Sequence, residues 1–204
     1  MGSRSLIIIP TYNEIENITQ ILTALDEKAP GSDILVVDDN SPDGTAKAVQ
    51  DFANTHPQVH LLSREKKNGL AGAYIAGFQW GLKKDYDFFV QMDADFSHAP
   101  SDVPRLLKAL ETYDQAMGSR YIKGGSTSGW TLPRVLISRG GNIYARAVLG
   151  LGLNDLTGGF NAHRRAVLES IGLNDITSRG YAFQVEIKYR TYKKGFTQKE
   201  IPIL

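Results

Sequence analysis

The sequence predicts an α/β fold: a mostly parallel sheet with helices on both faces, formed as a single domain over residues 1–204. Over residues 6–119, short apolar segments alternate with segments in which apolar side chains recur at helical spacing. The short segments are almost continuously apolar, as expected of strands that are buried on both faces of a parallel sheet. A length of 204 residues suits one domain with a substantial core.

Each expected element is assigned from these patterns. The strands are expected at Leu6–Pro10, Ile34–Asp38, Val59–Leu62, Phe88–Asp93 and Ala116–Ser119. Two helices precede the second and fourth strands, each defined by apolar side chains three or four residues apart. Their side chains are Ile18, Ile21, Leu22 and Leu25 in the first helix, and Ile75, Phe78 and Leu82 in the other. After Tyr121 the pattern changes to a loop rich in glycine and serine, one long helix, and short segments rich in glycine and arginine.

Composition limits the functional classes. A net charge of +1 gives no indication of nucleic-acid binding, and we expect no nucleic-acid partner. The absence of cysteine excludes disulfides and thiolate metal sites and favours a reducing compartment. No uninterrupted apolar stretch approaches the roughly 18 residues that span a bilayer, and no signal peptide is recognisable. We therefore expect no transmembrane segment.

The most informative motif is Asp93-Ala94-Asp95, which follows an apolar, β-prone run. Residues two apart on a strand point to the same side, so Asp93 and Asp95 can converge on one point. Mg²⁺ and Mn²⁺ favour oxygen ligands and usually take some of them from phosphate and water. The pair is therefore a candidate seat for a metal–diphosphate, at the sheet edge where such folds bind ligands. Taken alone, it is explained equally well as solvated charge that ends a strand.

Two further acidic segments follow the first and second strands. In the first, Asn13 suits a helix N-cap with Glu14 in the first turn, which leaves Tyr12 unexplained. The Tyr12 ring could stack on a base. In the second, Asp38 and Asp39 are adjacent, so one carboxylate must face away from the other. The remaining one could accept hydrogen bonds from a ribose or a base, and turn chemistry alone is the alternative.

Three other features carry weaker signals. Arg120 ends the fifth strand and is well placed to bind a phosphate with two nitrogens, with a surface ion pair as the alternative. The small residues within Lys66–Ala73 open a helix, and packing against the sheet explains them better than a phosphate loop does. His98 stands alone on a loop, where a structural role is favoured over that of a catalytic base.

The segment at about 132–152 predicts a basic amphipathic helix, because it has three arginines and no acid. One arc holds Arg134, Ser138, Arg139, Asn142 and Arg146. The opposite arc holds Leu136, Ile137, Ile143, Tyr144, Val148 and Leu151. Such a helix can lie in a membrane interface. The rival is an ordinary surface helix with its apolar side in the core, and Gly140-Gly141 weakens the expectation of an unbroken helix.

In combination, these motifs carry a resemblance to a known family. Pro10-Thr11-Tyr12-Asn13-Glu14, Val37-Asp38-Asp39-Asn40-Ser41-Pro42-Asp43-Gly44-Thr45, Met92-Asp93-Ala94-Asp95-Phe96-Ser97-His98 and Gly118-Ser119-Arg120-Tyr121 occur in that order. From about Leu6 onward the chain resembles family 2 glycosyltransferases, specifically dolichol- or polyprenol-phosphate mannose synthases. The resemblance implies the Rossmann-like GT-A fold. It also implies transfer of mannose from GDP-mannose to dolichyl or polyprenyl phosphate, with inversion of the anomeric centre.

The resemblance also implies roles for single residues. The guanosine would be held by Pro10, Tyr12, Glu14, Val37 and Asp39. Asp93, Ala94 and Asp95 would contact the donor diphosphate and a Mg²⁺ or Mn²⁺ ion, with Asp95 the principal metal ligand. The acceptor phosphate would be held by Arg120, Arg134 and Ser138, and Arg120 would also serve the donor and catalysis with Asp93 and Asp95.

The resemblance further implies a peripheral protein at the cytoplasmic face of a membrane, with a small membrane-protein subunit as a candidate partner. Members of the family continue past the strand ending Glu200-Ile201-Pro202-Ile203-Leu204 with an arginine and a lysine on a mobile loop over the diphosphate. We expect this catalytic loop to be absent from the chain. Two alternatives stay open: a polyprenol-phosphate glucosyl- or other hexosyltransferase, and a non-catalytic nucleotide-sugar binding subunit. A Rossmann dinucleotide module is disfavoured, because no glycine-rich fingerprint follows the first strand.

Overall fold

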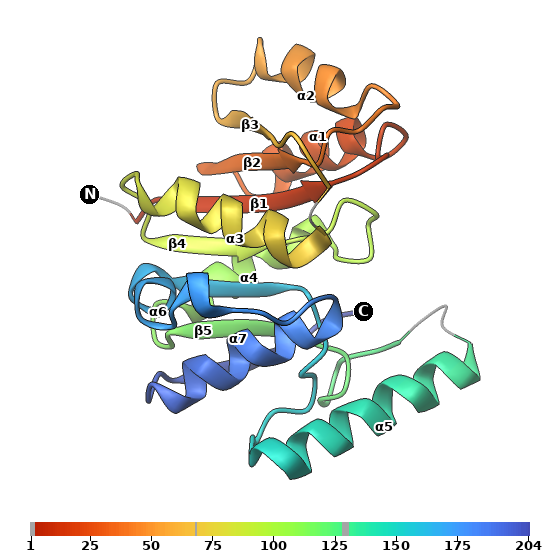
Figure 1. The fold of residues 1–204 in the computed structure, drawn as a ribbon, viewed down its shortest axis with the longest axis vertical. Coiled ribbons are helices and arrows are strands. Elements are labelled where there is room, and N and C mark those ends of the chain that lie inside the picture. Colours follow the sequence, from red (N-terminus) through yellow and green to blue (C-terminus); the bar gives the residue numbers. More distant parts are fainter. Residues whose placement is uncertain (1–2, 68, 128–130) are drawn as a thin grey trace.

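The computed structural model describes residues 3–67, 69–127 and 131–204, apart from the side chain of Arg134. Within these residues, seven strands form one sheet in the order β3-β2-β1-β4-β6-β5-β7, with helices on both faces (Figure 1). The strands are β1 (Ser5–Thr11), β2 (Ser32–Asp38), β3 (Val59–Ser63), β4 (Phe88–Gln91), β5 (Gln115–Ser119), β6 (Asn161–Arg164) and β7 (Gln198–Pro202). The helices are α1 (Ile18–Lys28), α2 (Thr45–Ala53), α3 (Gly69–Leu82), α4 (Val103–Ala109), α5 (Leu132–Leu149), α6 (Arg165–Ser170) and α7 (Tyr181–Lys193), with 3₁₀ turns η1 (Pro100–Asp102) and η2 (Leu173–Asp175).

The sheet is mostly parallel, as predicted. Strand β1 pairs in parallel with β2 and β4, β2 pairs in parallel with β3, and β5 pairs in parallel with β7. Strand β6 is antiparallel to both β4 and β5, so β4 and β5 run in the same direction. The carboxyl ends of β1, β2, β4 and β5 therefore lie along one edge of the sheet, and each leads into one of the motifs singled out in the sequence.

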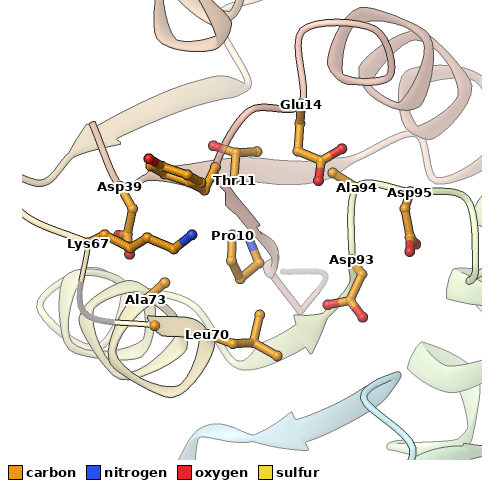
Figure 2. A pocket seen from close by; sticks show the side chains of 12 residues that line it. Pro10, Thr11, Glu14, Asp39, Lys67, Leu70, Ala73, Asp93, Ala94 and Asp95 are labelled. Atoms are coloured by element: carbon orange, nitrogen blue, oxygen red, sulfur yellow. The ribbon is translucent and has the colours of Figure 1, made fainter. Parts of the chain in front are cut away.

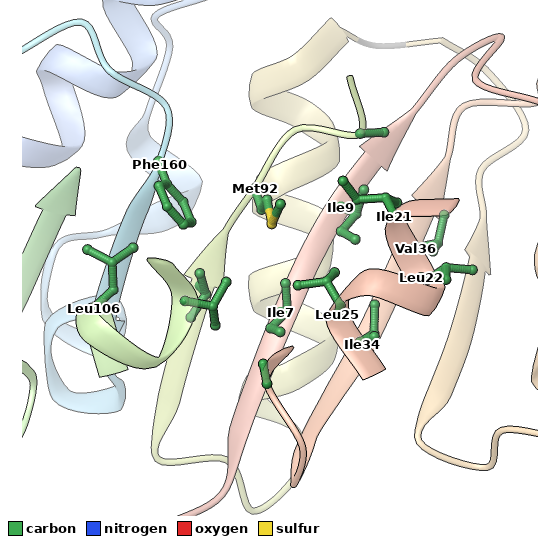
Figure 3. Packing of buried hydrophobic residues seen from close by; sticks show 14 of the residues in the cluster. Ile7, Ile9, Ile21, Leu22, Leu25, Ile34, Val36, Met92, Leu106 and Phe160 are labelled. Atoms are coloured by element: carbon green, nitrogen blue, oxygen red, sulfur yellow. The ribbon is translucent and has the colours of Figure 1, made fainter. Parts of the chain in front are cut away.

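The core forms one layer on each face of the sheet because side chains alternate along each strand. On β1, Ile7 and Ile9 contact the cluster that includes α1, α2 and α4 (Figure 3). Leu6 and Ile8 belong to the opposite cluster with α3, α6 and α7. Both faces of β1 are fully buried, which explains its uninterrupted apolar sequence.

The strands differ from the prediction in two places. Strand β4 ends at Gln91, so Asp93 and Asp95 lie in the loop beyond it rather than on the strand. Strand β6 was not expected, because it lacks the apolar run that identified the others. A strand was expected to end within Glu200–Leu204, and β7 ends there, at Pro202. In β6 the buried side chains of Asn161 and His163 are polar, and they form hydrogen bonds to polar groups of the neighbouring strands.

The interpretation of Asn13 as a helix N-cap was wrong. Helix α1 begins at Ile18, with Asn17 at the N-cap position, and its first turn contains no acidic residue. Asn13 instead has a φ angle of +63°, and asparagine is among the few residues that adopt this left-handed conformation readily. Its amide N–H donates to the Ser41 hydroxyl, 3.0 Å away, which ties the end of β1 to the turn after β2.

Candidate functional site

The loop after β4 presents two carboxylates. The buried Tyr74 of α3 donates its hydroxyl proton to Asp93 Oδ1 over 2.9 Å, and the Ser97 amide donates to Asp95 Oδ1 over 2.9 Å. Burial tends to raise the pKa of Asp95, but the hydrogen bonds from Ser97 outweigh it and lower the pKa. Asp95 is therefore ionised at neutral pH, with its charge at the mouth of the site.

The acidic pair offers carboxylate oxygens as candidate metal ligands. Asp93 and Asp95 each use Oδ1 in the hydrogen bonds described, and Oδ2 of Asp93 lies on the side of Gly159. Among residues that the structure describes, no group of three or more histidine, cysteine, aspartate or glutamate side chains is arranged to hold a metal ion. Two carboxylates suit a hard ion such as Mg²⁺ or Mn²⁺ that completes its shell with phosphate and water. The residues present therefore fit the metal that the sequence implied.

A first cavity of about 270 Å³ lies between the ends of β1 and β2, the start of α3 and the acidic loop. Figure 2 shows Asp93 and Asp95 on one side of this cavity and Asp39 and Lys67 on the other, with Pro10 between them. Its lining includes most of the residues that the resemblance placed at the donor: Pro10, Tyr12, Glu14, Asp39, Asp93, Ala94 and Asp95. Val37 is fully buried in the core beside α3, because strand alternation turns its side chain to that face.

The adjacent acids Asp38 and Asp39 diverge, as predicted. Asp38 is buried and accepts hydrogen bonds from the Thr11 hydroxyl (2.8 Å) and from the Ser41 amide and hydroxyl (2.9 and 2.6 Å). Asp39 forms an ion pair with Arg64 at 3.0 Å and lines the first cavity. Asp38 therefore holds the turn together, while Asp39 is the acid in contact with the cavity.

Lys67 is a lining residue that the sequence reasoning did not select. Its ammonium nitrogen lies 3.5 Å from the centre of the Tyr12 ring, a cation–π contact across the first cavity. The other charged side chains in the lining are Glu14, Asp39, Asp93 and Asp95, all acidic. The signal available in the sequence was the Lys66-Lys67 pair just before α3, which is not distinctive without the position of Tyr12.

A second cavity of about 400 Å³ opens on the other side of the acidic loop, where β4 and β5 end. It shares Asp93 and Asp95 with the first cavity and contains Arg120, His98 and Tyr181. The two cavities therefore meet at the acidic pair.

Arg120 is held by a buried partner that the sequence did not reveal. Its Nε and Nη2 donate to Oδ2 and Oδ1 of Asp155, each over 2.7 Å, and its amide donates to Oδ2 over 3.1 Å. Burial tends to raise the pKa of Asp155, but the hydrogen bonds and charge of Arg120 outweigh it, so the pKa is lowered. The pair fixes the plane of the guanidinium at the edge of the second cavity.

The other two residues expected at the acceptor phosphate lie on α5. The side chain of Arg134 is outside the described residues. Ser138 accepts a hydrogen bond of 2.7 Å from the Tyr121 hydroxyl, and Tyr121 directly follows Arg120. Ser138 is thus linked to the strand end that carries Arg120, but it is not in the described lining of the second cavity.

His98 has a structural setting, in agreement with the interpretation favoured from sequence. It is buried and stacks on Phe160 with ring centres 4.8 Å apart, and its Nδ1 accepts the Asp93 amide proton over 3.2 Å. Burial lowers its pKa despite the nearby carboxylates. A neutral imidazole that accepts at Nδ1 carries its proton on Nε2, so His98 holds the acidic loop against β6.

Helix α5 lies apart from the sheet (Figure 1) and packs with its polar side against the rest of the protein. Asn142 is buried, and its Oδ1 accepts the Leu156 amide proton over 2.7 Å. Six large apolar side chains of the helix are instead between 61% and 77% exposed. They are Leu132, Leu136, Ile137, Ile143, Tyr144 and Val148. These exposures exclude the alternative in which the apolar side lies in the core.

The predicted extent of this helix needs correction. Helix α5 runs through Gly140 and Gly141 without a break, but it ends at Leu149, short of Gly152. Gly150 terminates it with a φ angle of +66°, as glycine commonly does at a helix C-terminus. Leu151, expected on the apolar arc, is buried in a small cluster with Met117. No helix among the described residues has the length and apolar character needed to cross a bilayer.

A mostly parallel α/β sheet with helices on both faces is the architecture of the GT-A fold. The sequence model of glycosyl transferase family 2 matches residues 6–172, and the chain belongs to that family. The chain is therefore an enzyme of the glycosyltransferase class.

Relatives of known identity are close in sequence. An undecaprenyl-phosphate mannosyltransferase of Micrococcus luteus is 50% identical over 200 residues, covering 98% of this chain and 82% of the relative. A polyprenol monophosphomannose synthase of Mycolicibacterium smegmatis is 46% identical over 202 residues, covering 98% of this chain and 76% of the relative.

Solved structures show the same fold at lower identity. Glucosyl-3-phosphoglycerate synthase from Mycobacterium tuberculosis, solved with Mn²⁺, UDP and glucosyl-3-phosphoglycerate, matches with a TM-score of 0.71 and 19% identity, covering 99% of this chain and 71% of that one. A mannosyltransferase from Pyrobaculum calidifontis, solved with GDP-mannose and Mn²⁺, matches with a TM-score of 0.67 and 23% identity, covering 99% and 55%.

Proposed function

We propose that this glycosyltransferase moves mannose from GDP-mannose to the phosphate of a polyprenyl or dolichyl lipid and inverts the anomeric centre. The observation that carries the proposal is the meeting of two cavities at Asp93 and Asp95, one lined by the motifs matched to the donor and the other containing Arg120. Both close relatives carry names that specify mannose and a polyprenyl phosphate.

The first cavity supplies suitable partners for a guanosine diphosphate. Asp39 and Glu14 can accept hydrogen bonds from ribose hydroxyls or from the N–H groups of guanine, and the Tyr12 ring offers a stacking surface. Asp93 and Asp95 would hold the Mg²⁺ or Mn²⁺ ion with the diphosphate. When bound, that ion would offset the charge that develops on the departing GDP.

The proposed reaction requires no proton transfer to or from the protein. A phosphate monoester has its second pKa near 6, so at neutral pH the acceptor oxygen is largely deprotonated. That oxygen forms the new bond to the anomeric carbon as the bond from this carbon to the GDP oxygen breaks, and no proton has to move. The protein contributes alignment and electrostatic stabilisation. A neutral, buried His98 agrees with this scheme, because no general base is needed.

Access to a lipid acceptor is supported by α5. Its exposed apolar face, flanked by Arg139 and Arg146, has the composition of a helix that lies in the headgroup region of a bilayer. We propose peripheral attachment through this face, at the cytoplasmic side of the membrane, with a small membrane protein as a candidate additional anchor.

Calorimetry and transfer assays test the proposal. The purified protein is titrated with GDP-mannose and UDP-glucose, each with and without Mn²⁺, and labelled sugar transfer to a short-chain prenyl monophosphate is measured. We expect Mn²⁺-dependent binding of GDP-mannose and mannosyl transfer. Preference for UDP-glucose would favour the hexosyltransferase alternative, and binding without any transfer would refute the proposed reaction.

A further inference from the structure

Lys188 is a fully buried lysine on α7. Its ammonium donates three hydrogen bonds, to the backbone carbonyl oxygens of Asp155 (2.9 Å), Leu156 (3.0 Å) and Gly158 (2.8 Å). All three ammonium protons are therefore directed at one short segment. A buried lysine is costly to maintain, so its position calls for an explanation.

Segment 154–158 is held from two sides. Lys188 binds its carbonyl groups, while the Glu200 carboxylate accepts the amide protons of Asn154 (3.0 Å) and Asp155 (2.9 Å). Within the segment, the Gly158 amide donates to Asp155 Oδ1 over 3.1 Å. Backbone and side chain of Asp155 are therefore both fixed, although the segment belongs to no helix or strand.

This segment contributes directly to the second cavity. Asp155 orients the Arg120 guanidinium through two hydrogen bonds of 2.7 Å, and Thr157, Gly158 and Gly159 are part of the cavity lining. Arg120 lines the same cavity. A contact chain thus runs from Lys188 through the segment and Asp155 to Arg120.

We propose that Lys188 is a positioning residue for the acceptor phosphate: its ammonium holds segment 155–158 so that Asp155 presents Arg120 to the second cavity. The inference rests on the proposed function, because it names that cavity as the acceptor site. It assigns the lysine an effect on the acceptor and none on GDP, since the first cavity is formed by other segments.

The charge of this lysine has a measurable consequence. Burial lowers the pKa of Lys188 to about 8; Asp155 and Glu200 oppose this effect, and Arg120 adds to it. Of the charged groups around it, Asp155 has a lowered pKa and Arg120 a raised one, so both keep their charge near pH 8. Burial lowers the pKa of His163 to about 3, which keeps this nearby side chain neutral. Lys188 therefore loses its charge as the pH rises through about 8.

When Lys188 loses its charge, the stability of the folded protein should rise and the affinity for the acceptor should fall. The pKa of Lys188 is about 8 in the folded protein and near 10.5 when the chain is unfolded. Between these values the unfolded chain binds the extra proton, so this group makes the folded state more stable as the pH rises. Acceptor affinity should fall over the same range, because the neutral amine has only two N–H groups. One of the three carbonyl oxygens then loses its hydrogen bond, and the other two bonds become weaker. A lysine with a purely structural role would change the stability with pH but would leave the acceptor affinity unchanged.

The experiment compares the intact protein with Lys188→Met, and with Lys193→Met as the matched control, an exposed lysine on the same helix. Affinities for a short-chain prenyl monophosphate and for GDP are measured from pH 7 to 9.5, with the unfolding midpoint recorded in parallel. For the unmodified protein and the control, we expect acceptor affinity to fall about five- to tenfold across pH 8 at constant GDP affinity. For Lys188→Met, we expect weak acceptor binding that does not change over this range.

A second variant keeps the inference testable if Lys188→Met does not fold. Asp155→Asn interrupts the contact chain beyond Lys188, so it should bind the acceptor weakly and lack the step near pH 8. Retention of the full step in either variant, or a parallel loss of GDP affinity, would overturn the inference. In that event, mannosyl transfer by the unmodified protein would leave the proposed function intact. Absence of transfer to any prenyl phosphate would instead refute the proposed function, and the inference with it.

Discussion

Replacing Ile143 and Tyr144 with serine should release the enzyme from membranes without unfolding it. The two side chains are 66% and 72% exposed on α5. Full burial of an apolar side chain of this size contributes about 1.5–3 kcal/mol, so the exposed portions of the two correspond to about 2–4 kcal/mol. An interfacial helix immerses its apolar face only to the boundary between headgroups and acyl chains. We therefore expect the lower end, about 2 kcal/mol or roughly 30-fold in vesicle partitioning.

Co-sedimentation with vesicles of increasing anionic lipid content measures this loss, and the urea midpoint reports on folding. The matched control is Ile15→Ser with Tyr192→Ser, the same pair of residue types, 41% and 48% exposed outside α5. The control should retain vesicle binding, and both double variants should change the free energy of unfolding by about 0.5 kcal/mol or less per site. Equal vesicle binding by the α5 variant and the control, or unfolding of the α5 variant alone, would refute the assignment of this face to the membrane.

Three further predictions concern the site and the core. Asp95→Ala should abolish the effect of Mn²⁺ on GDP affinity in calorimetry, because the ion loses an anionic ligand; a full metal effect in the variant would contradict the site. Arg120→Ala should reduce transfer to prenyl phosphate at least about tenfold, the equivalent of one charge-assisted hydrogen bond, while GDP affinity is retained. Gly77→Ala should lower the free energy of unfolding by about 1–2 kcal/mol in urea titrations, because its Cβ would lie 2.6 Å from Ile8 Cγ2. Gly140→Ala, with no atom within 4 Å, should not destabilise the protein.

The sequence predicted those parts of the fold in which one physical signal dominates. Strands β1 and β2 are buried on both faces, so their apolar runs identified them directly. Strand β6 was missed because it lacks an apolar run and is held by pairing with β4 and β5, which are distant in sequence. The local motif at Asn13 offered two solutions, and the hydrogen bond to Ser41, 28 residues away, decided between them.

The residues of the candidate site also fall into those that the sequence predicted and those that it did not. The acids at the strand ends were found because each follows an apolar run, and the expected divergence of Asp38 and Asp39 needed only the geometry of adjacent residues. Asp155 and Lys188 were missed, since their roles depend on partners 35 and 33 residues away. In the sequence, Lys188 is one of several lysines near the C-terminus and carries no local sign of burial. Contacts between residues that are distant in sequence, rather than residue type, determine which charged groups belong to the site.

In strand β6, hydrogen bonds of buried polar side chains fix the register of the strand against its neighbours. His163 is fully buried between two glutamines: its Nδ1 accepts from Gln115 of β5 over 3.2 Å, and its Nε2 donates to Gln91 of β4 over 2.9 Å. One neutral tautomer satisfies both bonds, and burial lowers the pKa of His163 to about 3, so this tautomer persists at neutral pH. A slip of one residue would turn the imidazole to the other face and leave buried polar groups unpaired. The register of β6 is therefore fixed, and so is the position of Phe160, which precedes β6 and stacks on His98 behind the acidic loop. An apolar strand in this position would pair as well but would tolerate such a slip at lower cost. The polar side chains of β6 thus set the position of Phe160, which lines the second cavity together with Asp93.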